Sequence, residues 1–230
     1  KKIKKIIAVL EYLFTLHLKV LQNRIMSQSD QHLEDIQVIR KIMEESSRFL
    51  SLSGLSGIMA GLLGIAGAVA AQLIITKSGA PADWYMQPLA SGPDGLSSCL
   101  PLFLEMGVVL VLAFTGAVLF SMRKARKSGH KAWTPVTRRM LASLLIPLGT
   151  GGLFILLTSG TVPASVTAAS SLIFYGLAVV SAGKFTFGEI HWLGVLEVVT
   201  GLVCLVLPQY TIILWALGFG VIHIAYGLFM

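Results

Sequence analysis

Six apolar segments, each long enough to cross a membrane, constrain this chain more than any other feature. They cover roughly Leu52–Ile75, Leu100–Met122, Met140–Leu157, Val162–Ala182, Ile190–Leu207 and Tyr210–Met230. A helix needs about 20 such residues to cross roughly 30 Å of hydrocarbon. Only 13% of the 230 residues are charged, whereas soluble domains carry about a quarter. We therefore predict an all-α fold, a polytopic bundle of six transmembrane helices embedded in a lipid bilayer.

The basic residues predict the orientation of this bundle. The connection at 123–139 carries seven lysines and arginines and no acid, while the connection at 77–99 carries one lysine and two aspartates. Short cytoplasmic loops are enriched in Lys and Arg. We therefore expect 123–139 and both termini to be cytoplasmic. The same bias explains the net charge of +7, so nucleic acid is not an expected partner.

The first 50 residues differ from the rest because charges interrupt their apolar positions. If residues 1–25 crossed the membrane, the 123–139 loop would be placed outside, against the charge rule. They are predicted to form an amphipathic or self-associating helix, or to be an extension upstream of a natural start at Met26. Residues 30–50 predict a second amphipathic helix. We expect 1–50 to be a cytoplasmic segment that lies on the membrane, binds a protein partner or forms a homo-oligomer, and 51–230 to be the membrane domain.

Glu197 interrupts the fifth apolar segment, "LGVLEVVTGLVCLVLP" (193–208). A charge at mid-bilayer costs about 2.5–3.5 kcal/mol, so such groups face the bundle interior and a partner. Counted from the turn at Pro208, His223 lies at nearly the same depth as Glu197, and Tyr226 lies on the same side of its helix. The three residues are either a proton or ion site, since histidine titrates near neutral pH, or a polar contact that fixes helix packing.

Glu105 and Gln72 lie near the outer ends of the second and first segments. Two arrangements are open at this depth. The two side chains pair with each other, or Glu105 reaches the outer surface by itself. An acidic outer mouth formed by Glu105 would be consistent with cation entry.

Small residues mark the first segment, and a proline marks the third. Gly57, Gly61 and Gly64 have a spacing that lets helices approach closely in lipid. They predict that the first segment lies at the centre of the bundle or forms a dimer face. Pro147 removes a helix hydrogen bond, which predicts a kink or break near 143–149.

The sequence carries no motif that identifies an activity. Cys99 and Cys204 lack a CxxC pattern or a Cys/His cluster, so no metal site, cofactor or disulfide framework is predicted. HExxH, GxSxG and paired-carboxylate motifs are also absent. We expect a structural, sensor or assembly component of the membrane. The alternative is a small-molecule or ion/proton transporter or channel that uses Glu197 and His223, and the third class is an intramembrane enzyme.

Two stretches resemble known membrane proteins. "EESSRFLSLSGLSGIMAGLLGIAGA" (44–68) and "LEVVTGLVCLVLPQYTIILWALGFGVIHIAYGLFM" (196–230) resemble a group of small, uncharacterised bacterial six-span membrane proteins. The second stretch is also similar to the repeat of the HdeD-like acid-resistance membrane proteins. The matching positions are Gly201, Pro208, Gly220 and Gly227. The resemblance implies a six-span fold, a place in a bacterial inner membrane and a stress-linked function, and it brings no known activity.

Overall fold

The computed structural model describes residues 54–89, 96–129, 133–186 and 188–230, together with Lys19, Ile36 and Ile39. The three isolated residues are helical and exposed. The other predictions for residues 1–50 lie outside the described residues. These are the two amphipathic helices, the docking or self-association role and the start at Met26.

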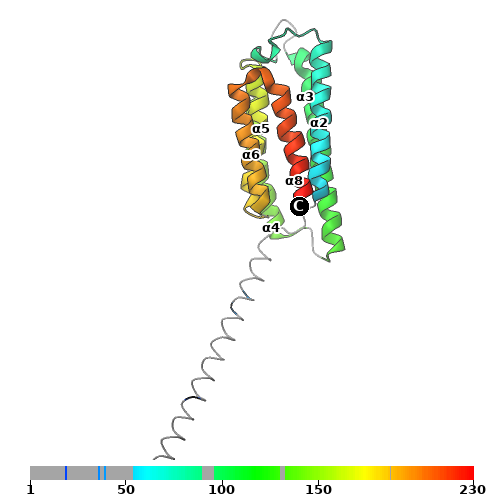
Figure 1. Ribbon diagram of the computed structural model, residues 1–230, viewed down its shortest axis with the longest axis vertical. Helices are drawn as coiled ribbons and strands as arrows, with labels where there is room; N and C mark the ends of the chain where they lie inside the picture. The colour runs from blue at the N-terminus through cyan, green and yellow to red at the C-terminus, as the bar shows by residue number, and fades with distance from the viewer. Residues whose placement is uncertain are drawn as a thin grey trace, which may run out of the picture. The chain divides into compact units, whose positions relative to one another are not determined.

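Within the described residues, six helices are long and apolar enough to cross a membrane (Figure 1). The first five are α2 (Gly54–Lys77), α3 (Leu96–Lys127), α4 (Pro135–Thr158), α5 (Ala164–Gly183) and α6 (Gly188–Val206). The last span is Pro208–Phe229, and it consists of η2 (Pro208–Tyr210), α7 (Thr211–Ala216), the π-helix η3 (Leu217–Ile222) and α8 (His223–Phe229). A 3-10 turn, η1 (Trp84–Met86), lies between α2 and α3. The predicted all-α membrane bundle is confirmed, and the chain is an integral membrane protein.

Two helices extend further than their hydropathy predicts. α3 continues through "RKARK" to Lys127, and α4 begins at Pro135, five residues early. Thr134 caps α4: its Oγ1 accepts the Thr137 N–H at 3.2 Å, and the Thr134 N–H donates to Thr137 Oγ1 at 3.3 Å. This capping box, with proline at the first helical position, starts the helix before its apolar part. We call this end of the bundle the basic end, after its exposed cations. They are Arg123, Arg126, Lys127, Arg138, Arg139 and Lys184.

The spans form two groups with the last span between them (Figure 1). α3 packs on α2 and α4 packs on α5, while α3 and α4 make little contact with each other in the described residues. α5 and α6 share the closest packing. An added Cβ on Gly176 or Gly194 would lie 2.6 Å from the carbonyl oxygen of the other glycine. α5 is therefore the most enclosed span, and most of the surface of α3 and α4 is free for lipid.

The glycines of α2 pack against the last span of the same chain. An added Cβ on Gly57 would lie 3.1 Å from Gly227 Cα, and one on Gly61 would lie 2.6 Å from Gly220 O. At Gly64 a Cβ would collide with the backbone of Phe219. In lipid, no hydrophobic effect drives helices together, so their association depends on van der Waals contact. The close approach at these glycines provides that contact.

The helix that contains Pro147 is not interrupted there. α4 is helical from 135 to 158, so the predicted break near 143–149 is wrong, while the alternative of a kink stays a prediction. The helical geometry changes instead in η3, which contains Gly218 and Gly220. Glycine has low helix propensity and permits a local change in helix geometry.

Candidate functional site

Glu197 is fully enclosed at the centre of the bundle. Its side chain is 0% exposed, and His223 of α8 is 4% exposed. His223 Nδ1 lies 3.1 Å from Glu197 Oε1. Counting residues from the turn at Pro208 predicted that these two groups share a depth, and the structure places them in contact.

The space for the Glu197 carboxylate comes from Gly218 in η3. An added Cβ on Gly218 would lie 2.7 Å from Glu197 Oε2 and 2.5 Å from Leu172 Cδ2. The carbonyl oxygen of Gly218 also lies 3.1 Å from His223 Nδ1. One glycine therefore leaves space for the acid and offers an oxygen to the histidine. π-helical turns are rare and occur often at functional sites.

Tyr175 of α5 is the third member of this site. Its hydroxyl lies 2.7 Å from His223 Nε2. Tyr226, which the sequence placed beside His223, instead donates its hydroxyl to Met230 Sδ at 3.0 Å. The depth count that found Glu197 would also have found Tyr175, had it been extended to α5. We call Glu197, His223 and Tyr175 the triad.

The triad accommodates either charge state of the histidine. A neutral His223 with its proton on Nδ1 donates to Gly218 O and accepts the Tyr175 O–H at Nε2. A protonated His223 donates from Nε2 to the Tyr175 oxygen. Neither oxygen of Glu197 has a hydrogen-bond partner among the described residues. The 3.1 Å between His223 Nδ1 and Glu197 Oε1 is therefore close enough for an ion pair but is not a hydrogen bond. A buried carboxylate in this position needs a cationic His223 or a proton of its own.

Packed side chains surround the triad. The ring centroids of Tyr175 and Phe219 lie 5.0 Å apart, and those of Phe219 and Trp215 lie 4.7 Å apart. Trp215 Nε1–H donates to Ser171 Oγ at 3.1 Å. Leu172 is 0% exposed and fills the remaining space beside Gly218. The charges of the triad therefore interact in a medium of low dielectric constant, where they act strongly on each other.

An apolar cleft lies between α3 and α4, in the half of the bundle nearer the basic end. Its volume is about 370 Å³, and residues of α2, α5, α6 and α8 complete its walls. The ring of Tyr175 lines this α3–α4 cleft, whereas Glu197 and His223 do not. The cleft therefore reaches the triad only at its tyrosine.

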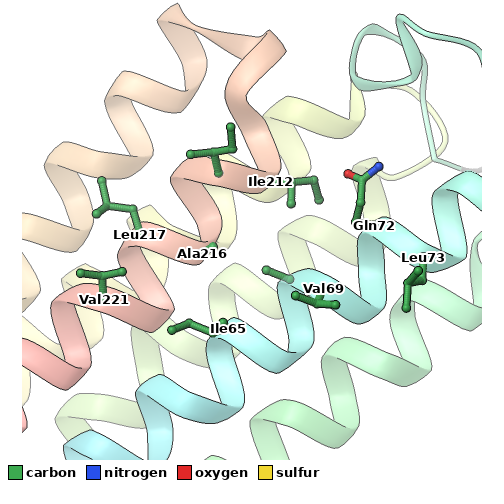
Figure 2. Close-up of a pocket in the computed structure, with 10 residues that line it drawn as sticks. Ile65, Val69, Gln72, Leu73, Ile212, Ala216, Leu217 and Val221 are labelled. Carbon is green, nitrogen blue, oxygen red and sulfur yellow. The ribbon is translucent and has the colours of Figure 1, made fainter.

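Glu105 and Gln72 are not brought together. Gln72 is exposed, and its Nε2–H donates to Thr76 Oγ1 at 3.3 Å. It lies on an open groove of about 500 Å³ between α2 and the last span, where the other labelled side chains are apolar (Figure 2). Both carboxylate oxygens of Glu105 are buried, and neither has a hydrogen-bond partner among the described residues. They face inward, close to Gly67 and a cavity of about 50 Å³ that Thr167 also lines, and do not form the expected outer mouth.

Cys99 and Cys204 are both buried, and neither forms a disulfide within the described residues. In the described part of the chain, no group of three or more histidine, cysteine or carboxylate side chains lies close enough together to hold a metal ion. Comparisons with protein-family models, with curated proteins and with solved structures give no match. The triad and the cleft are therefore the features from which a function can be argued.

Proposed function

We propose that this integral membrane protein is a structural or sensing component of its membrane, in which the triad holds α5, α6 and the last span together. The enclosure of Glu197 carries this proposal, because its side chain is 0% exposed. Neither Glu197 nor His223 lines the α3–α4 cleft, the groove of Figure 2 or the cavity beside Glu105. A carboxylate that conducts protons or ions lies on a water-filled path, whereas this one is enclosed by packed side chains.

The proposal includes an orientation and a setting. The basic end carries several exposed cations and a single described acid, Glu189. This excess of positive charge supports a cytoplasmic position for the basic end. Both termini then lie in the cytoplasm, and a bacterial inner membrane fits this charge bias. The similarity of 196–230 to the HdeD-like repeat supports a stress-linked setting. Residues 1–50 are the proposed segment for a protein partner or homo-oligomer.

Replacing Glu197 with glutamine tests the proposal, because the change removes the charge and keeps the volume. We expect neither the wild-type protein nor Glu197→Gln to dissipate a pH gradient imposed on liposomes. We expect Glu197→Gln to be less stable by about 1–3 kcal/mol, because it weakens the buried contact with His223. This corresponds to a melting temperature several degrees lower for a chain of this size. Thermal unfolding in detergent micelles measures the difference.

Glu189→Gln is the matched control. Glu189 lies in the exposed first turn of the same helix, so this variant loses the same charge and leaves the triad intact. It should melt within about 0.5 kcal/mol of the wild type, as other surface changes do. Proton flux in the wild type that disappears in Glu197→Gln and persists in Glu189→Gln would contradict the structural role.

One observation favours proton transfer as a second candidate. Tyr175 bonds His223 on one side and lines the α3–α4 cleft on the other. A proton could therefore move between the cleft and Glu197 through the tyrosine and the imidazole. The same flux measurement decides between the two functions, since only this second candidate requires flux.

A further inference from the structure

The α3–α4 cleft combines an apolar interior with an opening between two helices. Its walls include Leu110, Phe114, Leu144 and Val179, and its few polar groups lie mainly toward the basic end. α3 and α4 make little contact in the described residues, so the cleft can be entered sideways from the membrane. The cleft has a volume of about 370 Å³. If it were empty, the atoms that line it would have no dispersion contacts on that side. An apolar chain from the surrounding lipid would restore those contacts.

The mouth of the cleft is strongly basic. The lining residue Met122 adjoins the exposed Arg123 on α3, and the lining residues Thr137 and Met140 flank Arg138 and Arg139 on α4. Glu189 is the one acid that the structure describes at this end of the bundle. Trp133 is 68% exposed, as an indole at a membrane interface would be. The mouth is therefore complementary to an anion held at the depth of a lipid head group.

We propose that the α3–α4 cleft binds an anionic phospholipid, with one acyl chain between α3 and α4 and the phosphate against Arg138, Arg139 and Arg123. Basic pockets between transmembrane helices are suited to anionic head groups. The N-terminus of α4, which is the positive end of its helix dipole, lies at the same end and adds to the attraction for a phosphate. This binding does not depend on the proposed role of the triad, although the acyl chain would rest against the ring of Tyr175.

Native mass spectrometry of the intact protein tests the proposal directly. The probes are phosphatidylglycerol and phosphatidylcholine with identical oleoyl chains, added separately to the protein in detergent. We expect the protein to retain one phosphatidylglycerol molecule much more strongly than one phosphatidylcholine molecule. The double variant Arg138→Gln/Arg139→Gln should weaken the retention of phosphatidylglycerol by up to about thirtyfold, because each cation near an anionic lipid contributes about 1 kcal/mol. Lys77→Gln, at the opposite end of α2, should leave it unchanged.

A second pair of variants tests the acyl chain. Ala113 lines the cleft, whereas Thr115 is exposed on the same helix outside it. Ala113→Phe should abolish lipid retention, and Thr115→Phe should not. Thermal unfolding of each variant shows whether it is folded.

Three results would overturn the proposal. Equal retention of the two lipids by the wild type would remove the anionic specificity. Equal retention by Ala113→Phe and Thr115→Phe would show that the lipid lies elsewhere. A dimeric mass without retained lipid would assign the cleft to a second copy of this chain.

Discussion

Tyr175 is the residue at which the triad can be altered most gently, because its hydroxyl can be removed without changing the ring. Tyr175→Phe leaves His223 Nε2 without its 2.7 Å partner. We expect a loss of about 0.5–2 kcal/mol in the free energy of unfolding, the range for a buried hydrogen bond within a membrane. Denaturation in mixed detergent and SDS micelles measures this loss.

Tyr226→Phe provides the comparison for this variant. The Tyr226 hydroxyl bonds Met230 Sδ, near the end of the chain, and not the triad. We expect it to cost less than Tyr175→Phe. If Tyr226→Phe lowered the free energy of unfolding more than Tyr175→Phe, then Tyr226, the tyrosine predicted from the sequence, would contribute more to the stability of the bundle. The hydrogen bond between Tyr175 and His223 would then not have the stabilising role that we expect.

At the residue scale, a depth count along one hairpin placed Glu197 beside His223 because they lie at similar distances before and after the same turn. Because the count was confined to that hairpin, it did not reach Tyr175 on α5 and pointed to Tyr226 instead. Tyr226 is three residues from His223 and at a similar depth, but its hydroxyl extends toward Met230. Which way a side chain extends depends on rotamers and on neighbouring helices, neither of which a count includes. Glu105 shows the same limit, because its depth was counted and its inward direction was not.

At the scale of the element, the glycines of α2 make the most direct prediction. Gly61→Leu should separate α2 from the last span, because even a Cβ would lie 2.6 Å from Gly220 O. Overpacking of this kind costs about 1–3 kcal/mol or more, and we expect a lower melting temperature in detergent. Gly149→Leu on α4 is the matched control, since a Cβ there meets nothing within 4 Å. Equal melting temperatures for the two variants would contradict the packing role of Gly61.

The helices themselves were predictable to within a few residues, because apolar length alone indicates a span. The exceptions have local causes. The early start of α4 depends on the Thr134–Thr137 capping box, which a hydropathy window ignores. The helix is not broken at Pro147, and the change in helical geometry that the structure shows lies in η3. Pro147 was accommodated within α4, while Gly218 was needed to make space for a carboxylate on another helix.

For the whole molecule, the charge at the two ends predicts which end faces the cytoplasm. Ser78 and Ser128 are exposed at opposite ends of the bundle. We expect a membrane-impermeant maleimide to label Ser78→Cys on intact cells, and to label Ser128→Cys only after lysis. The unaltered protein is the control, because Cys99 and Cys204 are both buried. Labelling of Ser128→Cys on intact cells would place the basic end outside.

The six spans and their alternating direction follow from the sequence, but the gap between α3 and α4 does not. Each of these helices is apolar on nearly all sides. In a membrane, such a helix can face either protein or lipid, so its pattern does not say which neighbour it contacts. The arrangement of spans around the cleft was therefore visible only in the structure.

The π-helix η3 sets the angular phase of the last span. Successive residues of an α-helix are rotated by about 100° around its axis. One residue added to or removed from 217–222 would therefore turn all of α8 by that angle. α8 must direct His223 toward α6 and Gly227 toward α2 at the same time. The six residues of η3 thus act as a spacer whose length, counted in single residues, keeps one helix aligned with two neighbours.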